Sequence, residues 1–322
     1  MNKKCIVMLS GGLDSRLAIK IMQEQGFEVV ALFFKLPFGT GCCDEGCSFN
    51  FAQMQGVKLK VFDCTRGELL QEYLDCIKSP KYGRGAGVNP CVDCRIFIFS
   101  KAREFADSEG IDLIVSGEVL GERPMSQMMK SMNLVEEKSG LKGRLLRVLS
   151  AKHLPETDAE KKGLVNREKL YDIQGRRRVE QMKLAEKFKI NYPHPAGGCM
   201  LCEKDLKNRF QKLLERGISE DEIGLVGIGR HFMIDGSWIV LGRNEKENKV
   251  IERIGTLRAY PEKSSKKIFT EGIGELIVSE KSGPSALILG KGNIKDKVLE
   301  LMKAYSKQGN LEDRKNFDRW RL

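Results

Sequence analysis

IVMLSGGLDSR, residues 6–16, is the stretch that decides the fold of this chain. An apolar run typical of a buried strand leads into two glycines and then into the helical pattern LAIKIM. Glycines let the backbone approach an anion, and a new helix points unpaired N–H groups at it. A kinase-type P-loop would need GxxxxGK[ST], but the first lysine after the two glycines is Lys20. We therefore expect a loop that binds the pyrophosphate end of ATP, with Mg²⁺, through Ser10, Gly11, Gly12, Asp14 and Ser15.

Strand and helix patterns alternate through the first part of the chain. Strand patterns cover residues 28–38, 57–64 and 111–118, with helical patterns between them and another over 165–190. This alternation predicts an α/β fold with a doubly wound parallel sheet. Ligands of such sheets bind at the carboxyl ends of the strands, where the glycine turn and residues 116–122 both lie.

The pattern changes beyond about residue 215. An Asp-Gly turn at 235–236 joins two apolar runs as a hairpin, two short strand patterns follow at 274–279 and 285–290, and residues 293–308 have a helical pattern. We predict a first domain over residues 1–215 and a smaller α+β domain over 222–322. The charged tail, residues 312–322, is expected to be mobile.

Composition and charge narrow the function classes. No apolar run of membrane-spanning length occurs, and the N-terminus leads into the first strand without the pattern of a signal peptide. We expect a cytoplasmic protein with no membrane partner. The net charge is +11, and residues 140–212 alone hold 18 Lys+Arg against 9 Asp+Glu. Such an excess favours a polyanionic partner such as RNA, with a solvated basic face as the alternative.

Ten cysteines in a chain expected in a reducing compartment suggest metal ligands or nucleophiles. Two CxxC pairs, Cys91 with Cys94 and Cys199 with Cys202, could hold zinc or an iron–sulfur cluster. Alternatively, one thiol of each pair is catalytic and is activated at a helix N-terminus. The pattern does not decide between these uses. Of the remaining cysteines, three have no assigned role: Cys42, Cys43 and Cys47. The other three are expected in the core: Cys5, Cys64 and Cys76.

Several motifs of the first domain resemble known families. SGGLDS resembles the PP-loop of the ATP pyrophosphatase superfamily, whose members adenylate an oxygen of their substrate and release pyrophosphate. NPCVDCR resembles the NPDxxCN stretch of bacterial tRNA 2-thiouridine synthases, with Cys91 where that family has Asp, and GGCMLC resembles the site of its second catalytic cysteine. SGEVLGERPMSQ is similar to a segment of tRNA 4-thiouridine synthetases that lines the adenylate pocket, which implies that Gly117 borders the adenosine.

The resemblance implies ATP-dependent tRNA thiolation, in which a uridine carbonyl oxygen is adenylated and then replaced by sulfur. Asp14, Cys94 and Cys199 would be the catalytic residues. Sulfur would arrive as a cysteine persulfide or on a [4Fe–4S] cluster, and Cys91 favours the cluster, with Cys202 as a further ligand or a structural residue. Zinc is the less favoured metal. The donor would be a cysteine desulfurase, a sulfur carrier or free sulfide.

The second domain has a resemblance of its own. GRHFMIDGSWIVLGRNEKENKVI is similar to the RNA-binding domain of the NFACT proteins, which implies an RNA-binding role. Its alternative is a hairpin in which Asn244 and Asn248 only shape turns. Two other functions stay open: a PP-loop amido- or sulfur-transferase acting on a small molecule, and a non-catalytic RNA-binding protein containing zinc.

Overall fold

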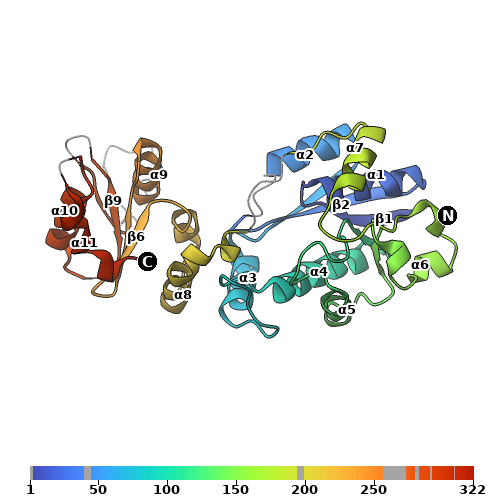
Figure 1. Cartoon of the computed structure of the whole chain (residues 1–322), viewed down its shortest axis with the longest axis horizontal. Helices are drawn as coiled ribbons and strands as arrows, with labels where there is room; N and C mark the ends of the chain where they lie inside the picture. Colours follow the sequence, from blue (N-terminus) through green and yellow to red (C-terminus); the bar gives the residue numbers. More distant parts are fainter. Residues whose placement is uncertain are drawn as a thin grey trace, which may run out of the picture. The chain divides into compact units, whose positions relative to one another are not determined.

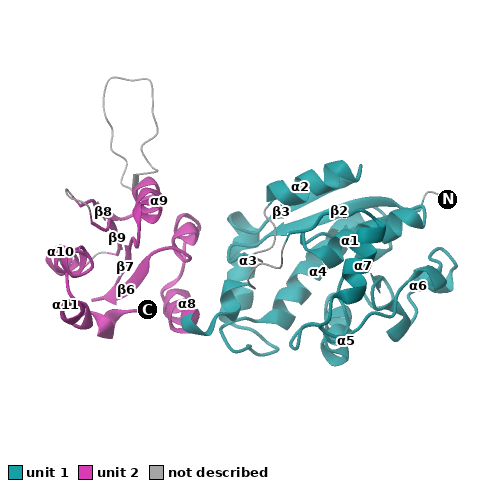
Figure 2. Cartoon of the chain, turned by 45° about the horizontal axis from the view of Figure 1, so that its top comes forward, with its two compact units in different colours: residues 1–205 teal, residues 206–322 magenta. Residues whose placement is uncertain are grey.

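A computed structural model of the chain describes residues 3–39, 45–193, 199–256, 273–279, 283–290, 292–307 and 309–322. The chain divides into two compact units, Met1–Asp205 and Leu206–Leu322 (Figure 2). The division precedes helix α8, Lys207–Arg216, which belongs to the second unit, whereas the sequence placed the end of the first domain at residue 215. None of the helices in the described ranges is both long and apolar enough to span a membrane.

The first unit is built on a five-stranded sheet in the order β3-β2-β1-β4-β5, and every neighbouring pair is parallel. The predicted α/β fold with a parallel sheet is therefore confirmed. The strand order reverses direction at β1, so a ligand crevice is expected between the carboxyl ends of β1 and β4. The strands are β1 Lys4–Met8, β2 Glu28–Lys35, β3 Lys58–Asp63, β4 Ile114–Ser116 and β5 Leu145–Arg147.

Helices cover both faces of this sheet, α1, α2 and α7 one face and α3, α4 and α5 the other (Figure 1). The alternation of β1 shows why: Cys5 and Val7 are buried in the core shared with α1, and Ile6 is buried in the core shared with α4. The helices are α1 Leu13–Glu24, α2 Glu45–Met54, α3 Gly67–Lys78, α4 Cys91–Ser108, α5 Met129–Lys138, α6 Asp158–Lys161 and α7 Val179–Lys187.

The predicted helical stretch over residues 165–190 is wrong for most of its length. Only α7 and a short 3-10 turn, Arg167–Lys169, are helical there. The backbone between them runs extended, because Tyr171 N donates to Val148 O at 3.1 Å and Ile173 N to Leu149 O at 2.8 Å. These long-range hydrogen bonds have no local signature in the sequence.

The second unit contains an antiparallel sheet in the order β6-β7-β9-β8. The predicted Asp-Gly hairpin is confirmed: Ile234 pairs with Ser237, and Asp235 and Gly236 have φ angles of 46° and 78°. Helix α10 packs on one face of the sheet and α11 contacts α10, whereas α9 contacts β8 and β9. The elements are β6 Arg230–Ile234, β7 Ser237–Leu241, β8 Glu275–Ile277, β9 Ala286–Leu289, α9 Glu245–Thr256, α10 Lys295–Ala304 and α11 Leu311–Lys315.

The C-terminal tail is docked rather than mobile, which corrects the expectation from its charge. After α11 and a 3-10 turn, Asp318–Trp320, the backbone of Arg321 pairs antiparallel with Phe232 of the edge strand β6. Leu322 N donates to His231 O at 2.9 Å. The chain end therefore extends the sheet beside β6 (Figure 1).

Candidate active site

The glycine turn after β1 has the geometry of an anion-binding loop. Gly11 has a φ of 81°, and the N-cap of α1 is Gly12, which has no side chain to bond the first helical N–H groups. Ser15 Oγ donates to Gly12 O at 2.8 Å, which fixes the first turn. Among the residues that the structure describes, a Cβ on Gly12 would meet only Ser10 Oγ, at 3.7 Å. The space beside Gly12 is thus open to a ligand, and Ser10 and Ser15 lie at its border.

Asp14, on the first turn of α1, has an unsatisfied carboxylate. Its Oδ1 is buried and has no hydrogen-bond partner within the described part of the chain. Burial raises the pKa of Asp14 to about 6, Glu122 adds to the rise, and Arg178 and Arg123 oppose it. An orphaned carboxylate oxygen beside an anion loop is suited to a bound cation such as Mg²⁺.

Gly117 lies at the end of β4, against the same turn. A Cβ on Gly117 would come within 2.3 Å of Asp14 O and 2.7 Å of Ser15 N. Glycine is therefore required here because two backbones meet. The position predicted to border adenosine holds β4 against the start of α1.

Arg16 holds the glycine loop in place through hydrogen bonds to backbone oxygens, a role that the sequence did not indicate. Its buried guanidinium donates from Nε to Gly11 O at 2.8 Å and from NH1 to Asn191 O at 2.7 Å. The same group lies over the ring of Phe51 at 4.6 Å. Arg16 thus ties the loop to α2 and to the segment that precedes the second CxxC pair.

The two CxxC pairs, predicted from spacing alone to work together, are brought into contact by the loop before α4. A Cβ on Gly87 would lie 2.2 Å from Leu201 O, and Val88 N donates to the same oxygen at 2.9 Å. At the other end of this loop, Asn89 Nδ2 donates to Cys91 Sγ at 3.1 Å. The glycine-rich segment therefore clamps the second pair onto the start of α4.

The four thiols differ in acidity. Hydrogen bonds from Cys199 and from Cys91, with the charge of Arg123, lower the pKa of Cys202 to about 6 against the effect of burial. The pKa of Cys199 is raised, first by its hydrogen bond to Cys202. Burial raises the pKa of Cys94 to about 11 despite its place in the first turn of α4. The exposed Cys202, considered only as a ligand or structural residue from the sequence, is therefore the thiolate of the group.

The two CxxC pairs were expected to hold a metal or a cluster. Within the ranges that the structure describes, no three His, Cys, Asp or Glu side chains are arranged to hold a metal ion. The four cysteines are described and carry free thiols, and Cys199 and Cys91 both form hydrogen bonds to Cys202, so a zinc ion or a [4Fe–4S] cluster at these pairs stays a prediction. Cys42 and Cys43 lie outside the described residues.

Arg123 connects the anion loop to the thiols. It is exposed, and its charge lowers the pKa of both Asp14 and Cys202. It belongs to the segment SGEVLGERPMSQ, of which the sequence interpretation singled out Gly117 alone. A cation that acts on a buried carboxylate and on a thiolate places the two candidate sites within electrostatic reach of each other.

A hollow of about 390 Å³ lies elsewhere, beside β5 and α6. Its charged walls are satisfied within the protein: Arg147 is bound by Glu118 at 3.0 Å and by Glu136, and Glu160 is bound by Arg167 at 2.6 Å. Neither the loop nor the thiols line it. We therefore assign the chemistry to the loop and the thiols.

Comparison with known proteins finds similarity in the first part of the chain. Residues 3–142 match the family described as tRNA methyl transferase HUP domain. The matched range includes the glycine turn and strands β1 to β4 of the parallel sheet.

Among named proteins, the chain is 32% identical over 124 residues to "tRNA-specific 2-thiouridylase MnmA" of Nitratiruptor sp., covering 36% of this chain and 35% of that protein. It is 34% identical over 122 residues to the protein of the same name from Synechocystis sp., covering 36% and 34%. The chain thus spans about a third of the length of these relatives. A solved structure titled "Crystal structure of a 4-thiouridine synthetase - RNA complex with bound ATP" aligns with a TM-score of 0.40 at 13% identity, over 70% of this chain and 52% of that chain.

Proposed function

We propose that this protein is an ATP-dependent tRNA sulfurtransferase. The observation that carries the proposal is an anion loop with an orphaned Asp14 oxygen in the same unit as a group of thiols that form hydrogen bonds to Cys202, within the described residues. A loop that activates an oxygen and a thiol that delivers sulfur must act on one substrate atom, so they must lie close together. The HUP match and the named relatives support ATP binding and a tRNA substrate.

In the first step, ATP binds with its phosphates beside Gly12 and its Mg²⁺ at Asp14. The N–H groups at the start of α1 and the side chains of Ser10 and Ser15 orient the phosphates. The uridine carbonyl oxygen attacks the α-phosphorus and pyrophosphate leaves. The oxygen then departs as AMP, a far better leaving group than the original carbonyl oxygen.

In the second step, sulfur replaces that oxygen. We write this step with thiols alone. Cys202 attacks the sulfane sulfur of the donor and becomes a persulfide, whose outer sulfur attacks the activated carbon as AMP leaves. A neighbouring thiol, Cys199 or Cys94, then attacks the bridging sulfur, which releases thiouridine and leaves a cysteine disulfide for an external thiol to reduce.

The test measures pyrophosphate release and tRNA sulfur separately. We expect tRNA-dependent pyrophosphate release by the unchanged protein. Cys202→Ser should keep this release but lose thiolation, and the one of Cys199→Ser and Cys94→Ser that removes the resolving thiol should do the same. Cys76→Ser, which changes a free thiol outside the two pairs, should keep both activities. Pyrophosphate release that needs no tRNA would contradict a tRNA substrate and favour the small-molecule alternative.

The sulfur route has its own measurement. Incubation with a sulfur donor, alkylation and peptide mass spectrometry should find the persulfide on Cys202. Iron and zinc are determined on the same protein after anaerobic purification. About four irons per chain, lost in Cys91→Ala, would replace the thiol route with a cluster.

The second unit is proposed to bind the RNA, as its resemblance to the NFACT domain implies. In its motif, however, Asn244 Oδ1 caps α9 by accepting from Glu247 N at 3.0 Å. Asn248 accepts from Ser285 N at 3.1 Å and donates to Gly283 O at 3.0 Å. These two asparagines therefore shape the fold, and an RNA contact must be sought among other side chains.

A further inference from the structure

Five arginines of the second unit lie close enough for their charges to act on one another. Arg209 has its pKa lowered to about 10 by burial and by Arg243 and Arg321. Arg230 has its pKa lowered by burial and by Arg314, Arg321 and Arg243. We call this group the arginine cluster: Arg209, Arg230, Arg243, Arg314 and Arg321.

The arginine cluster is assembled from five separate parts of the chain. Arg209 comes from α8, Arg230 from the edge strand β6 and Arg243 from the turn after β7, whereas α11 and the chain end supply the others. The docked tail is what brings Arg321 beside β6, because its backbone pairs with Phe232. Both views show the chain end next to β6 and α8 (Figures 1 and 2).

Few carboxylates balance these charges. Within the described ranges, Arg243 is the one member with an acidic partner in contact, Glu247. Arg209 donates from NH1 to Val226 O at 3.3 Å, and its buried Nε has no hydrogen-bond partner among the described residues. Below the group, the neutral His231 accepts from Trp238 at 3.0 Å, and its pKa is lowered to about 3 by burial and by Arg209 and Arg243.

Aromatic rings are interleaved with the arginines. The guanidinium groups of Arg230 and Arg314 lie 4.9 Å and 5.3 Å from the centre of the Tyr305 ring. Arg319, next to the cluster, lies 3.9 Å from the Trp320 ring, which is half-buried. Guanidinium groups over ring faces keep their N–H groups available to an acceptor such as phosphate.

We propose that the arginine cluster binds the phosphate backbone of the RNA substrate. This inference rests on the proposed function for the identity of the RNA. Bringing five like charges together costs folding free energy, and a polyanion offsets that cost. Guanidinium forks match phosphate oxygens, and neighbouring rings can stack on bases. The cluster therefore suits RNA phosphates.

The test is tRNA affinity of the full chain as a function of KCl. Arg230→Gln with Arg321→Gln removes two cations without disturbing an ion pair of the described chain. If each binds one phosphate, the slope of log K against log salt falls by about 0.9 per contact, which weakens binding about 30-fold at 0.15 M salt. The matched control, Lys249→Gln with Lys295→Gln, removes two exposed cations of the same unit and should keep the wild-type slope.

A second variant and a spectroscopic signal guard against a folding effect. Arg314→Gln with Arg319→Gln should weaken binding in the same way, and the melting temperature of each variant is measured alongside. Trp238 is fully buried, so a change in tryptophan fluorescence on adding tRNA should come from Trp320 and vanish in Trp320→Phe. Wild-type affinity and slope in both arginine variants would overturn the proposal.

The outcomes separate this proposal from the proposed function. Unchanged tRNA affinity of the variants, together with tRNA-dependent pyrophosphate release by the unchanged protein, rejects the cluster and leaves the sulfurtransferase standing. Weakened tRNA affinity without any such release keeps the cluster as an RNA surface and rejects the enzyme.

Discussion

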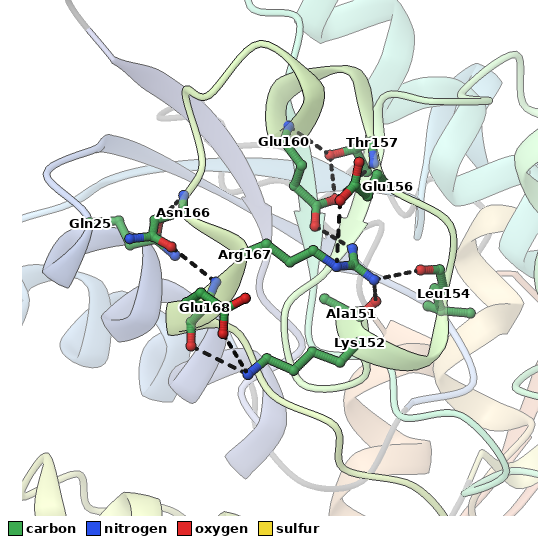
Figure 3. Close-up of polar contacts among 10 residues, drawn as sticks. All are labelled: Gln25, Ala151, Lys152, Leu154, Glu156, Thr157, Glu160, Asn166, Arg167 and Glu168. Carbon is green, nitrogen blue, oxygen red and sulfur yellow. Dashed lines mark hydrogen bonds and ion pairs between the residues drawn. The ribbon is translucent and has the colours of Figure 1, made fainter.

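The surroundings of Arg167 and those of the arginine cluster differ in how far carboxylates balance the arginine charge. Arg167 is held by Glu160 at 2.6 Å and donates to the carbonyl oxygens of Ala151 and Leu154 (Figure 3). Glu160 is in turn bound by the hydroxyl of Thr157 at 2.7 Å. In the arginine cluster, by contrast, a single carboxylate, Glu247, contacts one of five guanidinium groups within the described chain.

The difference shows that net charge does not locate a binding surface. Residues 140–212 have a large cationic excess, 18 Lys+Arg to 9 Asp+Glu. Two arginines of this segment, Arg147 and Arg167, nevertheless form ion pairs with carboxylates inside the protein. Residues 213–322 hold 20 Lys+Arg and 17 Asp+Glu, a smaller excess, but contain most of the unbalanced arginine cluster. What marks a polyanion site is the cation that lacks a partner in the fold.

The largest expected effect comes from breaking a balanced pair. Arg147 is almost fully buried between Glu118 and Glu136. Arg147→Met leaves the buried Glu118 with Arg95, at 3.4 Å, in place of two cations and should lower the free energy of unfolding by about 3 kcal/mol. Urea denaturation measures the loss, and the folded fraction should keep wild-type tRNA affinity. A loss below about 1 kcal/mol would contradict the assigned balance of this site.

How much of the fold and of the candidate site the sequence could predict depends on how far apart in the sequence the contacting residues are. The anion loop was predictable, because a strand, a glycine turn and a helix start are neighbours in sequence. The parallel sheet and the Asp-Gly hairpin followed from equally local patterns. The paired CxxC motifs indicated that distant thiols meet, but not that Cys202 would be the acidic one. Its acidity depends on hydrogen bonds from Cys199 and Cys91 and on the charge of Arg123.

The features that were missed depend on contacts between distant segments. Arg16 reads as an ordinary helical residue until Asn191 and Phe51 are placed around it. The extended segment before α7 exists because it pairs with residues beyond β5. The charged tail looked mobile, but its contact with β6 orders it. No local pattern specifies any of these contacts.

Asp14 extends the comparison to an unbalanced carboxylate and gives the second prediction. Its pKa is raised to about 6, so the folded protein binds a proton that the unfolded chain, with a pKa near 3.8, releases. Stability should therefore fall as the pH rises from about 4 to about 6, and Asp14→Asn should remove that fall. The variant should be about 1–3 kcal/mol more stable at pH 7.5 and about equal at pH 4. Urea denaturation at both pH values, without ATP or Mg²⁺, is the measurement.

The same variant should lose tRNA-dependent pyrophosphate release, since the ligand at the orphaned oxygen would be gone. Gain of stability with loss of activity is expected of a charge kept for a ligand. Equal pH dependence of the two proteins would show that Asp14 is satisfied in solution.

The third prediction concerns the thiolate that Arg123 balances. With a pKa of about 6, Cys202 should be mostly thiolate at pH 7, and its alkylation rate should reach half its maximum near pH 6. Its rate at pH 7 should exceed that of an ordinary exposed cysteine by about two- to threefold, because the larger thiolate fraction is partly offset by the lower nucleophilicity of a more acidic thiol. Iodoacetamide labelling followed by mass spectrometry gives the profile. Arg123→Gln should shift the midpoint upward, whereas Arg84→Gln, whose guanidinium donates to Val88 O and Lys78 O, should leave it unchanged.

The smallest expected effect on tRNA affinity comes from exposed lysines of the basic segment, residues 140–212. Lys152 and Lys183 are exposed members of the basic segment, and each lies beside a carboxylate, Glu168 at 3.8 Å and Glu180 at 3.0 Å. Exposed pairs of this kind contribute at most about 1 kcal/mol to stability. Lys152→Gln with Lys183→Gln should therefore change tRNA affinity by less than about threefold and keep the salt slope, because neither contacts a phosphate. A loss as large as that expected for Arg230 and Arg321 would mean that total charge, not missing partners, locates the RNA surface.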